Sequence, residues 1–85
     1  MVFDKPVLLV NTCSMLGNCF LKMYELQKAE SCFVEALQIS EKLKTTTEKL
    51  KPDLIAKIYL NLGVIASKKG LPADAVKFYE VCIHM

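Results

Sequence analysis

Apolar residues recur along this chain at alternating spacings of four and three, which is the period of one face of a helix. The first series follows Pro6, a residue suited to a first helical turn, and predicts a helix to about Met23. The positions in this series are Leu9, Cys13, Leu16 and Phe20. A longer series begins with a helix near Glu25 and comprises Ala29, Phe33, Ala36, Ser40, Leu43, Thr47 and Leu50. The first half of the chain therefore predicts two consecutive helices, of which the second is long.

Proline and glycine divide the second half. Pro52 disfavours a helical conformation at the residue before it and suits a new first turn, so a third helix is predicted from about Asp53. Gly70 and Pro72 supply the end of that helix and the start of a fourth. The third helix carries Ile55, Tyr59, Leu62 and Ala66, and the fourth carries Ala75, Tyr79 and Cys82. Because no segment alternates with period two over the length of a strand, we expect an all-α protein of two antiparallel helical hairpins.

The two halves repeat each other without a gap. Leu16-Gly17 aligns with Leu62-Gly63, Ala29 with Ala75, Phe33 with Tyr79, and Ala36 with Cys82. Glycine and alanine leave room where two helices cross, and an aromatic ring fills the groove one turn later. We therefore expect Gly17 and Gly63 to let the helices of each hairpin approach closely, with Phe33 and Tyr79 packed beside them.

This order of small and aromatic residues resembles the tetratricopeptide repeat, which has Leu-Gly, an aromatic three residues later, then Ala and a second aromatic. The matching positions are Leu16, Gly17, Phe20, Ala29, Phe33 and Ala36 in the first repeat, and Tyr59, Leu62, Gly63, Gly70, Ala75 and Tyr79 in the second. Cys13 stands where the family often has Trp, and Glu41 where it has Pro. Ala66 replaces the aromatic of the second repeat and Pro72 its turn Tyr, which should leave that groove less filled.

The spacing of the repeats is longer than usual. Gly17 and Gly63 are 46 residues apart, whereas the family's period is about 34 residues. The extra residues fall between Ser40 and Pro52, where threonines at 45–47 lower helix propensity by roughly 0.5 kcal/mol each. We therefore expect lengthened helices with a loop at the threonines. The resemblance implies a single domain over residues 1–85, a short right-handed α-solenoid with one repeat at about 6–50 and another at about 52–85.

Composition narrows the functional classes. Apolar residues make up 53% of the chain, which suggests that part of the apolar surface meets a partner or neighbouring chain. The net charge is only +2 and the lysines are dispersed, so nucleic acid binding has no support. The four cysteines form no C-x-x-C pair and are accompanied by one histidine, which argues against a metal site and for buried, reduced thiols. We expect a cytoplasmic protein without a cofactor, a targeting segment or a membrane span.

Catalysis is not expected either, because an enzyme needs a nucleophile, base or metal in a convergent site. His84 stands at the end of the fourth helix, where a histidine suits the negative end of the helix dipole better than proton transfer. The carboxylates are dispersed and are most simply read as solvated helix faces: Glu25, Glu30, Glu35, Asp53 and Asp74.

The resemblance implies where a partner would bind, since the first helices of such hairpins line a groove for an extended peptide or partner helix. By register the groove residues are Asn11, Ser14, Met15, Asn18 and Lys22, and Ala56, Lys57, Leu60, Asn61, Val64 and Lys68. Asn18 and Asn61 fall where family members that grip a chaperone's C-terminal carboxylate have asparagines. Ser14, however, stands in place of their first lysine, and the third repeat of that clamp is missing.

Two functional hypotheses follow. The first is a scaffold or adaptor that binds a protein or peptide in this groove. The second is an assembly element, or a piece of a longer repeat array, that associates through open apolar faces and depends on residues such as Val81 and Ile83. The second has weight because at least three repeats are normally needed for stability and no polar cap follows the fourth helix. An unrelated four-helix bundle would also fit the spacings, but the paired glycines, alanines and aromatics favour the repeat.

Overall fold

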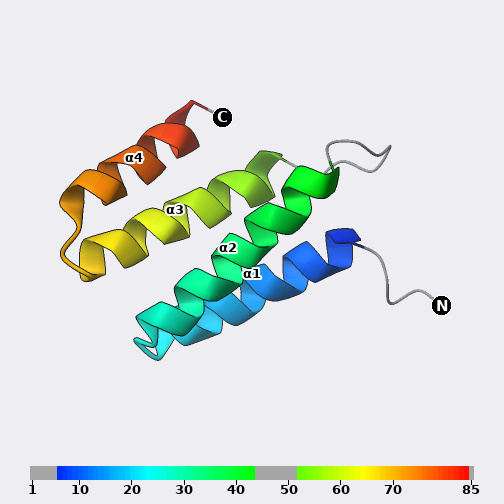
Figure 1. The fold of residues 1–85 in the computed structure, drawn as a ribbon, viewed down its shortest axis with the longest axis horizontal. Helices are drawn as coiled ribbons and strands as arrows, with labels where there is room; N and C mark the ends of the chain where they lie inside the picture. Colours follow the sequence, from blue (N-terminus) through cyan, green and yellow to red (C-terminus); the bar gives the residue numbers. More distant parts are fainter. Residues whose placement is uncertain (1–5, 44–51, 85) are drawn as a thin grey trace.

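The computed structural model describes residues 6–43 and 52–84, which form four α-helices in two antiparallel hairpins (Figure 1). The helices are α1 (Pro6–Lys22), α2 (Leu26–Leu43), α3 (Pro52–Lys68) and α4 (Pro72–Ile83). The all-helical fold, the two hairpins and the helix starts at Pro52 and Pro72 are therefore as predicted. The expected continuation of the second helix through Thr47 and Leu50, and the loop at the threonines, lie outside the described residues.

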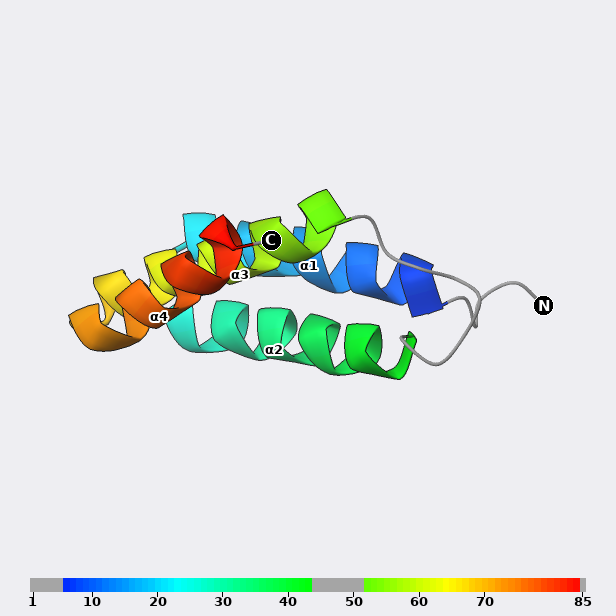
Figure 2. The same cartoon turned by 90° about the horizontal axis from the view of Figure 1, so that it is seen from above.

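The hairpins meet mainly through α3. This helix packs against α4 within its own hairpin, and across the hairpins it packs chiefly on α2 and to a lesser extent on α1. Seen from above, α1 and α3 lie in one layer with α2 below them (Figure 2). The first helices of the two hairpins thus share one side of the molecule, as the family resemblance implied.

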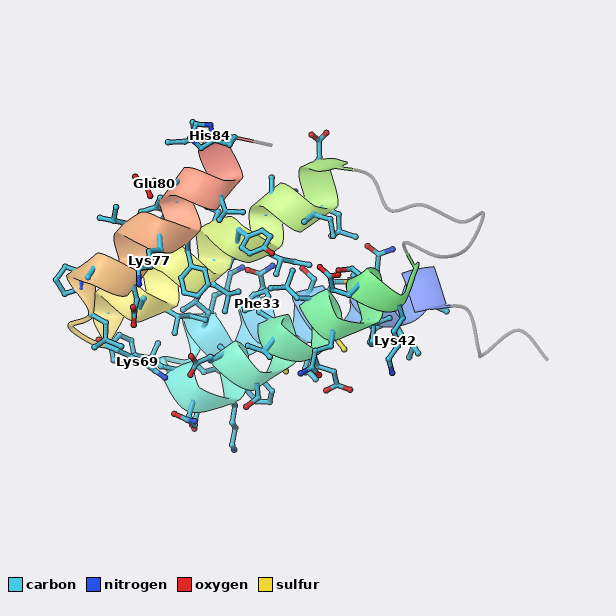
Figure 3. All side chains as sticks on the ribbon, turned by 45° about the horizontal axis from the view of Figure 1, so that its top comes forward. Phe33, Lys42, Lys69, Lys77, Glu80 and His84 are labelled. Atoms are coloured by element: carbon cyan, nitrogen blue, oxygen red, sulfur yellow. The ribbon has the colours of Figure 1, made fainter. Side chains whose placement is uncertain are left out.

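The core lies among α1, α2 and α3, and Phe78 of α4 packs against it. Its buried apolar members are Val10, Ala29, Phe33, Ala36, Ile58, Leu62 and Ile65. Phe33 lies near the centre of the molecule (Figure 3), with its ring against Gly17 of α1. Phe33 and Ala36 come from α2, whereas Ile58, Leu62 and Ile65 come from α3, so the core joins the two hairpins into one unit.

Both glycines permit the close approach that the sequence predicted. A Cβ atom added to Gly17 would lie 2.8 Å from the ring of Phe33, and one added to Gly63 would lie 2.5 Å from the ring of Tyr79. Carbon atoms do not approach this closely without displacement, so a larger residue at either position would push the aromatic ring away. Ala29 and Ala75, at the corresponding helix crossings, are also buried.

The two hairpin turns have the same backbone geometry with different residues. Tyr24 follows α1 with φ 61°, and Gly70 follows α3 with φ 79°. In each turn the next residue donates its N–H to a carbonyl five positions back: Glu25 N to Phe20 O at 2.8 Å, and Leu71 N to Ala66 O at 2.9 Å. This is the Schellman end of a helix, in which glycine meets no steric cost and tyrosine does.

The buried side of α1 differs from the expected one. Leu9 and Leu16 have exposed fractions of 45% and 47%, although both fall in the apolar series that predicted the helix. The residues buried along α1 are instead Val10, Ser14 and Gly17, one position displaced from that series. The reason is that α1 packs against α2 through this second row. Cys13 and Phe20 of the predicted row still pack against the core, whereas Leu9 and Leu16 lie half in water.

Candidate functional site

The candidate binding surface is the side of the molecule formed by α1 and α3. Residues four, three and four positions apart place one row of side chains on each helix. We call this surface the α1/α3 face; its residues are Asn11, Met15, Asn18 and Lys22 on α1, and Lys57, Asn61, Val64 and Lys68 on α3. Every residue of the set is exposed or half-buried, so all of them are accessible to a partner.

The structure brings together the two asparagines that the sequence singled out. Asn61 Nδ2 donates a hydrogen bond to Asn18 Oδ1 at 3.3 Å, across the junction between the repeats. Because each amide has both donor and acceptor capacity, the pair still presents Asn18 Nδ2 as a donor and Asn61 Oδ1 as an acceptor. One donor and one acceptor side by side match the C=O and N–H groups of a peptide backbone.

The charge of the two helices is predominantly positive. Between them α1 and α3 carry Lys22, Lys57 and Lys68 against one carboxylate, Asp53. Lys68 Nζ lies 5.4 Å from the ring centroid of Tyr24, which is exposed at the end of α1. Tyr24 was not among the predicted site residues. Its backbone conformation places it there, and the only signal in the sequence is its alignment with Gly70.

One predicted groove residue, Ser14, has different surroundings from those expected. Ser14 is only 6% exposed, because it lies in the row of α1 that faces α2, between Val10 and Gly17. It is therefore not available to a ligand in this structure. Leu60, at the equivalent position of α3, is 45% exposed and therefore accessible. Ala56 is half-buried on α3, and the remaining predicted positions belong to the α1/α3 face.

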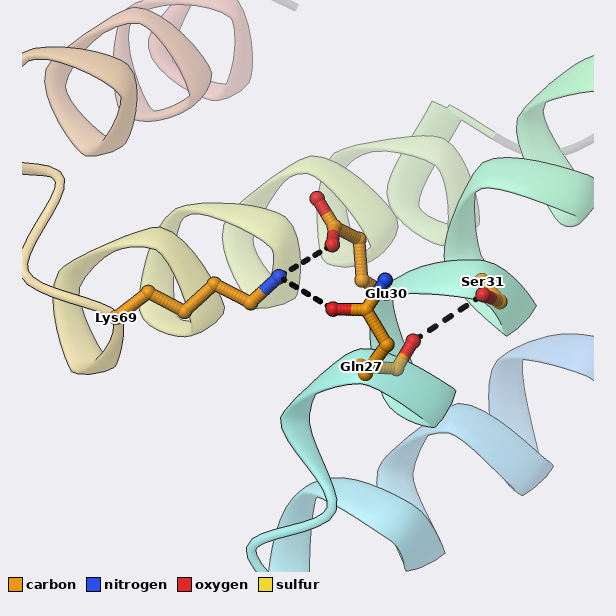
Figure 4. Close-up of polar contacts among 4 residues, drawn as sticks. All are labelled: Gln27, Glu30, Ser31 and Lys69. Carbon is orange, nitrogen blue, oxygen red and sulfur yellow. Dashed lines mark hydrogen bonds and ion pairs between the residues drawn. The ribbon is translucent and has the colours of Figure 1, made fainter.

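A separate hollow of about 310 Å³ lies beside the second hairpin. It is lined by Glu30, Leu62, Ala66, Lys69, Leu71, Asp74, Lys77 and Phe78. Ala66, which replaces the aromatic of the repeat pattern, is among these residues. Lys69 Nζ bridges to Glu30 Oε1 at 2.5 Å and to Gln27 Oε1 at 3.4 Å (Figure 4). These contacts join the end of α3 to the first turns of α2.

The four cysteines are free thiols. Burial, and then the nearby Glu35 carboxylate, raise the pKa of both Cys13 and Cys32, which keeps these thiols protonated and poorly nucleophilic. Cys19 is exposed. No group of three or more potential metal ligands occurs within residues 6–43 and 52–84.

Comparison with known families identifies the same two repeats as the two hairpins of the structure. A family model described as the tetratricopeptide repeat matches residues 10–43 and 56–84, about three quarters of the chain. The chain therefore belongs to the tetratricopeptide repeat family, whose members are generally protein–protein interaction modules and typically not catalytic. Neither the curated proteins nor the solved structures include a significant match to the chain. Among the described helices none is long and apolar enough to span a membrane.

Proposed function

We propose that this chain is an interaction module that binds a segment of a partner protein along the α1/α3 face. The observation that carries the proposal is the Asn18–Asn61 pair, which connects the two repeats in the middle of this face. An extended peptide lying across the pair would receive a hydrogen bond from Asn18 and donate one to Asn61. Such contacts are made to the backbone of the peptide, so they contribute affinity for peptides of many different sequences.

The lysines favour an acidic partner. Lys57 and Lys68 lie on α3 and Lys22 at the end of α1, so positive charge flanks the amide pair. Charges on an exposed surface mainly increase the association rate and the choice among partners, and salt screens them. We therefore expect the chain to select acidic peptide segments over basic ones of equal length, and to lose this preference at high salt.

A peptide array with acidic, neutral and basic sequences tests the proposal. The Asn18→Ala/Asn61→Ala variant should lose binding to all peptides, by roughly tenfold for two hydrogen bonds. Lys57→Ala should weaken the binding of acidic peptides only. Lys77→Ala is the matched control, because Lys77 is an exposed lysine on α4, away from the α1/α3 face. Equal effects of Lys57→Ala and Lys77→Ala, or unchanged binding by the asparagine variant, would refute the proposal.

A second candidate function is assembly through exposed apolar faces. The observation favouring it is the difference between Leu16 and Leu62, which occupy the same position of the two repeats with exposed fractions of 47% and 2%. Leu62 lies in the core that joins the two hairpins, so the apolar surface at the equivalent Leu16 would suit a similar hairpin. Concentration-dependent association of the chain would support this function, and a monomer at every concentration would exclude it.

A further inference from the structure

Side-chain polar contacts join the two repeats within the described part of the chain. Asn61 bonds to Asn18, and Lys69 bonds to both Glu30 and Gln27. One partner of each contact comes from the first hairpin and the other from α3 or the turn that follows it. Their positions identify which residues would meet if another hairpin packed onto either end of the molecule in the same way.

The repeat alignment shows which residues at the two ends are equivalent to the residues that make these contacts. Residues 46 positions after Asn18, Gln27 and Glu30 are Val64, Ala73 and Val76. Residues 46 positions before Asn61 and Lys69 are Met15 and Met23. A repetition of the internal interface would therefore pair Met15 with Val64, and Met23 with Val76 and Ala73. Where the chain has a polar contact between its repeats, the equivalent positions at the ends would form an apolar contact.

The residues at these end positions are accessible. Met15, Met23 and Val76 have exposed fractions of 68%, 63% and 53%. Ile83 is 77% exposed, whereas Leu37, its equivalent in α2, packs against the core. The α1 side adds Leu9, Leu16 and Cys19, whose equivalents Ile55, Leu62 and Ile65 are half-buried or buried. Both ends thus present apolar side chains at the positions that a repeated interface would bring together, Met15 and Met23 on one end and Val64, Ala73 and Val76 on the other.

We infer that the occupant of the exposed α1 side is α4 of a second copy of this chain, packed head to tail in the register of the internal α2–α3 interface. The inference rests on the second candidate function and adds its geometry. The occupant is a second copy because the apolar residues of both ends match each other, while the polar pairs that hold the internal interface are absent from both. A head-to-tail contact leaves each assembly with two free ends, so association is open-ended.

Light scattering on the chain as it elutes from a sizing column, over a wide concentration range, measures this association. Met23→Lys and Val76→Glu should each weaken association of the variant with itself by about tenfold, because each leaves a charge facing an apolar side chain. A mixture of the two variants should associate again, because each supplies the face that the other has lost. The variant carrying both substitutions should also recover, since it recreates the Lys69–Glu30 pair between copies.

Val81→Glu is the matched control. The sequence alone suggested that Val81 takes part in association, but its equivalent is Glu35, which is exposed on α2, so the inferred interface excludes it. This variant should associate like the unchanged chain, and circular dichroism should show the same helix content for all variants. Association that is equally sensitive to Val76→Glu and Val81→Glu, or that two variants fail to restore in mixture, overturns the head-to-tail geometry while leaving assembly intact. A monomer at every concentration overturns both.

Discussion

The two repeats have the same pattern of residues and different degrees of burial. Leu16 of the first repeat is 47% exposed, while Leu62 at the same position of the second is 2% exposed. Cys19 is exposed, and its equivalent Ile65 is 1% exposed. Since the helices are alike, the difference arises from the neighbour: α3 packs on α2, and α1 has no preceding hairpin in this structure. Position in the repeat determines which side is apolar, and position in the stack determines whether that side is buried.

The second helices show the opposite asymmetry. Phe33 is fully buried, whereas its equivalent Tyr79 is only partly buried. Phe33 is enclosed because α2 has α1 on one side and α3 on the other, while α4 packs against α3. The most protected part of the molecule is therefore the junction between the hairpins, and the largest effects of mutation are expected there.

Truncation of the paired leucines should give the largest difference between the repeats. We expect Leu62→Ala to lower the free energy of unfolding by about 3 kcal/mol, because it removes a buried side chain and leaves a cavity. Leu16→Ala should cost less than about 1 kcal/mol, since its side chain is half in water. Urea unfolding followed by circular dichroism, at one low protein concentration, measures both. Equal losses would show that Leu16 is covered in solution.

Substitution of Gly17 should cost more stability than substitution of Gly63, although Gly63 lies closer to its aromatic ring. Alanine at either position gains about 1 kcal/mol of helix propensity and costs roughly 1–3 kcal/mol of overpacking. Phe33 cannot move within the core, but Tyr79 is partly exposed and its ring can turn aside. We expect Gly17→Ala to destabilise the chain by about 2 kcal/mol net and Gly63→Ala by less than about 1 kcal/mol. A larger loss in Gly63→Ala would mean that the closer approach, 2.5 Å against 2.8 Å, determines the cost.

The reaction rates of the thiols should separate exposed Cys19 from the half-buried Cys13 and Cys32. Folded Cys19 should react with iodoacetamide roughly tenfold faster than Cys13 and Cys32, whose raised pKa values leave less thiolate at a given pH. Raising the pH should narrow the difference, because those two thiols ionise at higher pH than an ordinary cysteine. Mass spectrometry of the alkylated peptides gives the rates, and the same reaction in urea is the control. Equal rates in the folded chain would contradict the described burial.

Substitution of the turn residue should give the smallest effect. Tyr24→Gly is expected to raise the free energy of unfolding by about 0.5–1 kcal/mol. The reason is that it removes the strain of a left-handed backbone conformation, which Gly70 adopts without cost. Thermal unfolding measures the change, and Tyr24→Phe, which keeps both the strain and a ring near Lys68, is the control. A loss of stability in Tyr24→Gly would show that the contact of the ring with Lys68 outweighs the strain.

Much of the fold was predictable because it depends on local properties. Helical periodicity, the prolines that start α3 and α4, and the glycine–aromatic pairs all follow from residues close together in the sequence or from the repeat itself. The candidate surface was predictable only in part. The row containing Asn18 and Asn61 was identified, and the structure added their hydrogen bond. Ser14 was assigned to the wrong side of α1, because one residue of displacement turns a side chain by about 100° around a helix.

The sequence by itself determined the helices, the hairpins and the register of the repeats, since backbone sterics and side-chain periodicity act over a few residues. Only the tertiary structure decided which apolar residues are buried, that Asn18 meets Asn61, and that Lys69 reaches Glu30. Burial and contact depend on which helix lies alongside, and equivalent positions of two repeats with the same pattern have different neighbours. The same leucine is therefore core in one repeat and surface in the other.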